Sequence, residues 1–312
     1  MSAPDHPEPG LPADRAGEPG ALHAAALRTV RRLVALDTEH GATAAVPAVR
    51  EAVRSFPQLS ADPGSLHAED ADRLAALAEL AEVIGWILFD AGLHPQARRM
   101  NARALALAGL CGDRWTARLV LLNHSMLEAH TGRPRAALAS AARAVGPKPL
   151  PARVSSLVLI RQAHALAMLG ASREPLVLIA RAQSRFLDGV SYRDPHWAWW
   201  IDQSELLGHR GWVHARLGRW DRAVPLLHAA AAAPGPSYRH LFTAELLAAL
   251  VRAGAWTEAE DLIADLAPRA AGIGSVRTTG TLRRTARGLR RSGAAPGRLK
   301  DAAVFLLESL PA

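Results

Sequence analysis

The chain has 312 residues, a formal net charge of +8 at pH 7 and a single cysteine, Cys111. This length is sufficient for a sizeable core in one helical-repeat domain, and one cysteine excludes an intrachain disulfide framework and a thiolate metal site. No apolar run approaches the roughly 18 residues that a membrane-spanning helix needs, so we expect a cytoplasmic protein with no membrane partner.

The first 69 residues are predicted to hold a leader, two helices and a linker. Residues 1–20 carry five prolines and four acidic residues against Arg15. This composition predicts a disordered leader rather than a signal peptide. Apolar residues at helical spacing predict helices at Leu22–Leu36 and Val46–Phe56, with Gly41 ending the first. A stretch rich in Pro, Ser and Asp follows, so residues 21–69 are assigned to an N-terminal helix pair and linker.

A glycine followed five residues later by an alanine recurs along the middle of the chain. The five glycines are Gly92, Gly132, Gly170, Gly218 and Gly254, and only the third is followed by a proline instead. A small residue or leucine comes seven residues before each glycine, and an apolar residue comes twelve after it. This is the spacing of the tetratricopeptide helical hairpin, in which small residues let two antiparallel helices touch. Residues 70–271 are therefore predicted to form an all-α, tetratricopeptide-like right-handed superhelix of antiparallel helix pairs.

The hairpins assign ten helices to this region. The predicted pairs are Ala71–Asp90 with Pro95–Ala108, Arg114–His130 with Pro134–Val145, Ala152–Leu169 with Glu174–Phe186, His196–Leu217 with Trp220–Ala232, and Tyr238–Ala253 with Trp256–Leu266. An unusually long connection, Leu187–Pro195, precedes the long helix His196–Leu217. Residues 272–312 are predicted to form a basic C-terminal helical cap with helices Thr279–Ser292 and Gly297–Leu310.

Motifs for catalysis are missing from the sequence. His124 and Glu128, four residues apart on one predicted helix face, are the only tidy pair of metal ligands. Two ligands do not make a zinc site. We therefore expect no enzyme activity, no cofactor and no metal ion, and binding is the first hypothesis because a helical superhelix offers an extended concave surface.

Seven residues occupy inward-facing positions on the first helices of successive pairs. They are Trp86, Asp90, His130, Arg161, Glu205, Trp212 and Arg216. Because the helices of a solenoid stack side by side, we expect one continuous strip along an open groove. Such a groove would hold a partner protein, a peptide or a small signal molecule. The alternative is that the tryptophans pack in the core and the polar residues form ion pairs within a water-filled groove.

The positive charge is concentrated near the C-terminus. Leu266–Lys300 contains eight arginines, one lysine and no acidic residue. The candidate patch for nucleic acid or an acidic partner is Arg283, Arg284, Arg287, Arg290 and Arg291. The alternative is that these arginines lie on an ordinary solvent-exposed helix and are numerous only because the composition of the chain favours arginine. Because the segment has no interleaved aromatic residues and no recognised motif, we expect no sequence-specific DNA binding by this chain alone.

The order of several short motifs resembles a known family. They are Arg31-Arg32-Leu33 to Asp37 and Gly41, Val46-Pro47, Ala81-Glu82, Gly85-Trp86, Asp90-Ala91-Gly92, Ala104 to Ala108, Gly112-Asp113, Asp194-Pro195 with Trp197, Asp202 to Glu205, Ser275-Val276-Arg277 and Leu282-Arg283. From Leu22 onward the chain is similar to the C-terminal sensor of actinobacterial, Streptomyces-type transcriptional regulators. Those proteins carry an N-terminal XRE helix-turn-helix and a tetratricopeptide-like sensor. About 20 Pro-rich residues before Leu22 cannot supply the helix-turn-helix.

The resemblance implies a regulatory protein that binds a signal molecule, peptide or partner protein in its concave groove, acting in transcriptional control. Pairing with a separate, full-length regulator is one route, and a homodimer is left open. Two alternatives remain: a scaffold or accessory protein of a biosynthetic cluster, and a weak nucleic-acid binder that uses the basic C-terminal segment.

Overall fold

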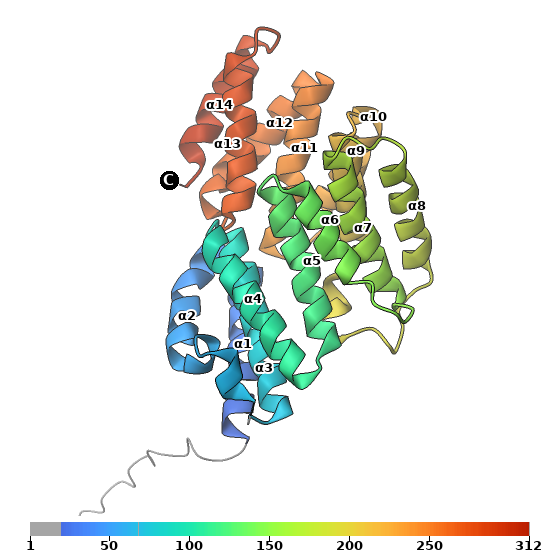
Figure 1. The fold of residues 1–312 in the computed structure, drawn as a ribbon. Coiled ribbons are helices and arrows are strands. Elements are labelled where there is room, and N and C mark those ends of the chain that lie inside the picture. Colours follow the sequence, from blue (N-terminus) through green and yellow to red (C-terminus); the bar gives the residue numbers. More distant parts are fainter. Residues whose placement is uncertain (1–19, 68, 312) are drawn as a thin grey trace, which may run out of the picture.

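All regular secondary structure in the described residues is helical. The computed structural model describes residues 20–67 and 69–311, which contain fourteen α-helices, five short 3-10 helices and no strand (Figure 1). The predicted all-α class is confirmed. The predicted leader lies outside the described residues, apart from Gly20.

The helices alternate with short turns along the whole described chain. The α-helices are α1 (Ala21–His40), α2 (Ala42–Ser55), α3 (Ala71–Asp90), α4 (His94–Cys111), α5 (Arg114–His130), α6 (Pro134–Arg143), α7 (Ala152–Met168), α8 (Glu174–Leu187), α9 (Gln203–Arg216), α10 (Trp220–Ala232), α11 (His240–Ala253), α12 (Trp256–Leu266), α13 (Val276–Arg291) and α14 (Gly297–Ser309). The 3-10 helices are η1 (Pro57–Leu59), η2 (Pro63–Leu66), η3 (His196–Trp200), η4 (Ser237–Arg239) and η5 (Ala267–Gly272).

The five predicted hairpin turns share one hydrogen-bonded geometry. All five hairpin glycines have a positive φ, between 69° and 88°, a conformation that glycine adopts without steric cost. In each turn the residue after the glycine donates its backbone N–H to the carbonyl oxygen of the residue five positions earlier. Leu93 N donates to Leu88 O at 2.8 Å, and Ala255 N donates to Leu250 O at 3.0 Å. This is the Schellman motif that ends a helix. Glycine recurs at these positions because the motif needs a residue with a positive φ.

The odd-numbered helices form one row. From α1 to α13, each odd-numbered helix contacts the next one, and each even-numbered helix packs against the odd-numbered helix before it (Figure 1). The small residues of the repeat lie where paired helices touch. A Cβ atom on Gly211 of α9 would lie 2.7 Å from Leu227 Cγ of α10, and Ala163 of α7 is completely buried.

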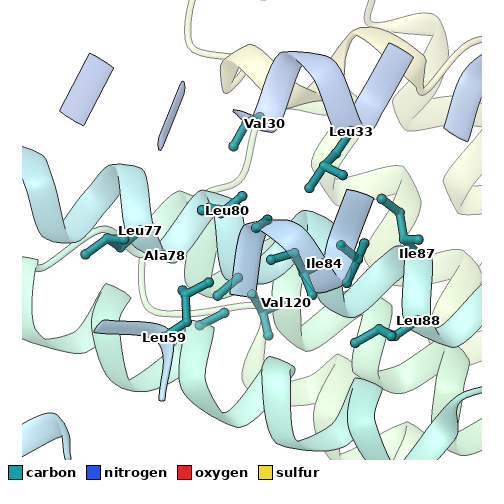
Figure 2. Close-up of a cluster of buried hydrophobic side chains, with 14 of the residues drawn as sticks. Val30, Leu33, Leu59, Leu77, Ala78, Leu80, Ile84, Ile87, Leu88 and Val120 are labelled. Carbon is teal, nitrogen blue, oxygen red and sulfur yellow. The ribbon is translucent and has the colours of Figure 1, made fainter. Parts of the chain in front are cut away.

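The first helix packs on the repeat array through apolar side chains. Val30 and Leu33 point from α1 toward Leu80 and Ile84 of α3, and Leu59 of η1 lies in the same cluster (Figure 2). All five side chains are buried. The N-terminal helix pair therefore shares its core with the repeats that follow it.

The two ends of the helix row meet. Thr43 N, at the start of α2, donates to Gly274 O at 2.9 Å, and Ser237 Oγ of η4 donates to Asp37 O of α1 at 3.1 Å. A Cβ atom on Gly41 would lie 2.7 Å from the Cα of Gly274. The row thus bends until the C-terminal end of α1 lies beside η4, and the turn between α1 and α2 lies beside Gly274, just before α13.

One predicted helix is wrong. The sequence predicts a single helix at His196–Leu217, but the chain forms η3, then a non-helical break at Ile201 and Asp202, then α9. Asp202 adopts an extended backbone, and its Oδ1 accepts the Glu205 N–H at 2.9 Å, which caps α9. The tryptophans of η3 consequently lie on a separate segment that does not follow the axis of α9.

Candidate ligand-binding site

A cavity of about 170 Å³ lies between the helix row and the segments that cross it. Its aromatic lining is Trp86, Trp197, Trp199, Trp200 and Tyr238, its aliphatic lining is Val30, Val34, Val83, Ile87 and Leu119, and its polar lining is Asp37, Thr38, Glu79, Glu82, Thr116, Asn123, Arg161, His196 and Glu205. We call it the aromatic cavity. Its walls come from α1, α3, α5, α7, η3, α9 and η4.

One wall of the aromatic cavity is η3. His196 Nε2 lies 3.2 Å from Glu79 Oε1 of α3, and this hydrogen bond raises the pKa of the imidazole. The contact ties η3 to a helix 117 residues earlier in the chain. Trp197 is buried, whereas Trp199 is 59% exposed, so the cavity reaches solvent beside Trp199.

Among the described residues, two buried carboxyl groups of the cavity accept side-chain hydrogen bonds only from uncharged donors. Trp86 Nε1 donates to Asp37 Oδ2 at 3.2 Å, and Asn123 Nδ2 donates to Glu82 Oε1 at 2.6 Å. Burial raises the pKa of Asp37 to about 7, with a further contribution from the negative charge of Asp90. Burial also raises the pKa of Glu82 to about 8.

A third buried carboxyl group belongs to a network with cations. His209 Nε2 lies 3.2 Å from Arg161 Nη1 and 3.1 Å from Glu205 Oε1, and Arg239 Nε lies 3.7 Å from Glu205 Oε2. Burial raises the pKa of Glu205 to about 7, although Arg161 and Arg239 oppose the shift. Burial lowers the pKa of Arg161 to about 9. Because one imidazole nitrogen cannot accept from Arg161 and donate to Glu205 at once, His209 bonds to one of them at a time.

A second cavity, of about 240 Å³, lies between α5, α7, α9, α11 and α13. Its polar lining includes His130, His164, Trp212, Arg216, Glu245, Arg277, Thr281 and Arg284. We call it the basic cavity because three arginines line it. Burial, helped by Arg277, lowers the pKa of His130 to about 3, so this imidazole is neutral at physiological pH.

The side chain of Arg277 crosses the interior between the two cavities. It is 3% exposed, its Nε donates to Asp90 Oδ1 at 2.8 Å, and its Nη1 lies 2.9 Å from Met126 Sδ. Its guanidinium carbon lies 5.3 Å from the ring centroid of Trp86 and 5.0 Å from that of Phe89. Arg277 thereby connects α13 with α3 and α5.

The seven predicted groove residues are not one open strip. Trp86, Arg161 and Glu205 line the aromatic cavity, whereas His130, Trp212 and Arg216 line the basic cavity. Asp90 lines neither, because it is completely buried in its ion pair with Arg277. Their role in ligand binding stays a prediction. Sequence reasoning missed Asp37 and Tyr238, which lie on α1 and η4, outside the repeated helices.

The predicted basic patch follows α13. Arg284, Arg287, Arg290 and Arg291 are exposed, and Arg283 is half-buried. Arg284 faces the basic cavity and donates to Thr281 Oγ1 at 2.9 Å. Within residues 20–67 and 69–311, none of the five forms an ion pair with an acidic side chain.

His124 and Glu128, the candidate metal ligands of the sequence analysis, belong to an ion-pair cluster. Glu128 Oε1 lies 3.7 Å from His124 Nε2 and 2.7 Å from Arg98 Nε, and Glu128 Oε2 lies 2.9 Å from Arg133 Nη1. Two guanidinium groups therefore occupy the carboxylate. Among the described residues, no three metal-ligating side chains come together in a group that could hold an ion.

No protein-family model matches the chain, and no curated protein matches its sequence. None of the described helices has the length and apolarity needed to cross a membrane. We therefore infer the function from the two cavities and the basic patch.

Glu82→Gln is expected to reduce the loss of stability at alkaline pH. The folded-state pKa of Glu82 is about 8 and its ordinary value is 4.5, so the folded protein holds a proton that the unfolded chain has released between these values. This contribution to stability is complete below about pH 4.5 and is lost as pH rises through about 8. The melting temperature, measured between about pH 7 and 9, should fall less in Glu82→Gln than in the wild type.

Glu258→Gln, on the exposed side of α12, is the matched control and should keep the wild-type slope. The measurement starts at about pH 7 because of two buried histidines. Burial lowers the pKa values of His164 and His209, so above this pH they are neutral in both the folded and the unfolded protein and do not contribute to the slope. Equal slopes in all three proteins would contradict a protonated, buried Glu82.

Proposed function

We propose that this protein is a tetratricopeptide-like regulatory protein that binds a small molecule in the aromatic cavity. The observation that carries the proposal is a cavity with five aromatic side chains and buried polar groups, whose walls include α1 at the start of the helix row and η4, about 200 residues later in the chain. Ligand sites in proteins have this character: mostly apolar and aromatic walls with a few placed polar groups. The proposed activity is binding rather than catalysis.

A small molecule fits the site better than a peptide or a folded partner. A peptide needs an open groove, but here η3, α1 and η4 help to wall in the aromatic cavity. The buried Arg277, which lines the basic cavity, also packs over Trp86 of the aromatic cavity. The cavity volume of about 170 Å³ is close to the roughly 150 Å³ of an apolar cavity that holds benzene. A partner protein would then bind on another surface.

The regulatory part of the proposal rests on the resemblance to actinobacterial regulators and on where the cavity lies. Val30 and Asp37 of α1 line it on one side and Tyr238 of η4 on the other. A ligand that contacts both would favour the arrangement in which α1 lies against η4, because binding shifts a protein toward the conformation that makes more contacts with the ligand. We propose that this closure reports ligand binding to a separate DNA-binding partner in the cytoplasm.

Mass spectrometry of small molecules carried through purification tests the proposal. The wild type should retain a compound that Val83→Trp loses, because a large side chain at Val83 would fill the cavity that this residue lines. Val177→Trp on α8, where valine is 56% exposed, is the matched control and should retain it. If Val83→Trp lowers the melting temperature, the smaller substitution Val83→Phe is used in its place to fill the cavity. Equal recovery from all proteins, or recovery from none, contradicts the proposal.

A second candidate function is nucleic-acid binding through α13, which the exposed arginines favour. We expect this chain to bind DNA weakly, without sequence selectivity and with a steep loss between about 50 and 200 mM salt, because only arginine–phosphate attraction is available. Replacing Arg283, Arg284, Arg287, Arg290 and Arg291 by Ser should abolish the shift in a gel assay. A shift that selects one sequence at physiological salt would contradict this expectation and support the second function.

A further inference from the structure

We infer that the ligand of the aromatic cavity is a small organic cation, with an ammonium group on an apolar body about the size of one aromatic ring. The inference rests on the proposed function and specifies the ligand class of the same site. It follows from three features: the aromatic walls, the charge balance among the buried polar groups, and the volume.

The walls suit a cation. Trp86, Trp197, Trp199, Trp200 and Tyr238 line the cavity. The faces of Trp and Tyr rings carry negative potential, and cages of such rings hold ammonium ligands. Trp86 already shows this behaviour toward the protein's own cation, since the guanidinium of Arg277 lies over its ring at 5.3 Å.

Among the described residues, two carboxyl groups that line the cavity have no cation paired with them. Glu79 is paired with His196, and Glu205 lies close to Arg161 and Arg239. Asp37 and Glu82 form no ion pair within residues 20–67 and 69–311, and each accepts one side-chain hydrogen bond from a neutral donor.

Both of these carboxyl groups are more than nine-tenths buried, and Asp37 Oδ1 has no hydrogen-bond partner among the described residues. A buried carboxylate is costly unless a cation pairs with it. The two groups are also close to the same ring, because Asp37 bonds to the indole of Trp86 and Glu82 precedes Trp86 by one helical turn. A ligand ammonium beside Trp86 would supply the missing partner.

Binding of a cation should release protons. The pKa values of Asp37 and Glu82 are raised to about 7 and about 8, and a bound ammonium would favour the ionised forms. The charged groups that act on Glu82 are Glu79 of its own helix and His196 of η3, and those that act on Asp37 are Asp90 of α3 and Arg277 of α13. Affinity for the cation should therefore rise with pH between about 6 and 8.

Three probes of similar size and different charge provide the test: benzylamine, benzyl alcohol and benzoate. Isothermal titration at about pH 7.5 should give a dissociation constant for benzylamine at least about tenfold below those of the other two. Titrations in phosphate and in Tris should differ in apparent enthalpy, because released protons are taken up by the buffer. Benzylamine should also bind more tightly at pH 8 than at pH 6.

Charge-removing variants identify the carboxyl groups that act. Glu82→Gln and Asp37→Asn keep the shape of the side chain, and each should weaken benzylamine binding about three- to tenfold more than it weakens benzyl alcohol binding. Glu258→Gln on the surface of α12 should change neither. Circular dichroism melts establish that each variant is folded at the temperature of the titration.

Two outcomes overturn the inference and are distinct from failure of the proposed function. If benzyl alcohol or benzoate binds as tightly as benzylamine, and Val83→Trp abolishes that binding, the cavity is a ligand site but not a cation site. If none of the three binds below about 10 mM, the cation class is wrong. The small-molecule function then depends on the co-purification comparison alone.

Discussion

Gly211→Trp is expected to destabilise the protein by at least about 4 kcal/mol. Gly211 lies where α9 touches α10, and even a Cβ atom there would be 2.7 Å from Leu227 Cγ and 3.0 Å from the Leu227 backbone nitrogen. An indole would force the two helices apart, and such overpacking with backbone displacement falls at the upper end of measured mutational effects. Urea unfolding followed by circular dichroism measures the loss.

Gly109→Trp is the matched control. Gly109 lies in the exposed part of α4, and a Cβ atom there would meet no atom within 4 Å. Because helix formation favours most residues over glycine, this substitution should change stability by less than about 1 kcal/mol. If both variants unfold at the wild-type midpoint, that result would contradict the close contact between α9 and α10 at Gly211.

Asp90→Ala is expected to cost about 3–5 kcal/mol, because it removes the partner of a buried cation. Arg277 is 3% exposed and Asp90 is completely buried, and Ser275 Oγ also donates to Asp90 Oδ1 at 2.9 Å. The substitution would leave the guanidinium without its anion and would release the start of α13 from α3. The free energy of unfolding, measured in urea, gives the effect directly.

Two comparisons separate the buried pair from charge effects in general. Combining Asp90→Leu with Arg277→Met removes both charges and should recover most of the stability lost by Asp90→Ala, because no unpaired charge remains. Glu51→Ala, which breaks an exposed pair with Arg32, should cost less than about 1 kcal/mol. If Asp90→Ala costs no more than Glu51→Ala, the contact between α13 and α3 does not hold the chain ends together.

The parts of the fold that sequence reasoning predicts well are local. The hairpin glycines occupy left-handed turns because a Schellman motif requires that conformation. Their small partners at helix contacts, such as Ala163, are buried because the helices touch there. Both features repeat at a fixed spacing, so one chain reveals them without knowledge of distant contacts.

The closure of the row and the shape of the candidate site depend on contacts between residues far apart in the chain. Asp37 and Ser237 are 200 residues apart, and Asp90 and Arg277 are 187 apart. Arg277 stands among arginines in the basic segment, and nothing in that pattern distinguishes it as the one inserted between two cavities. The same limit applies to η3: Trp197, Trp199 and Trp200 are close together in the sequence, but their position across the helix row depends on the contact between His196 and Glu79.

The most direct test of the central claim is the position of a bound cation. Crystals of the protein soaked with 4-bromobenzylamine would show the bromine by its anomalous scattering. We predict one strong peak in the aromatic cavity, which Trp86 and Trp200 line, with the ammonium group beside Asp37 or Glu82. A peak in the basic cavity or on the surface, with the aromatic cavity free of ligand, would contradict the assignment of this cavity as the binding site.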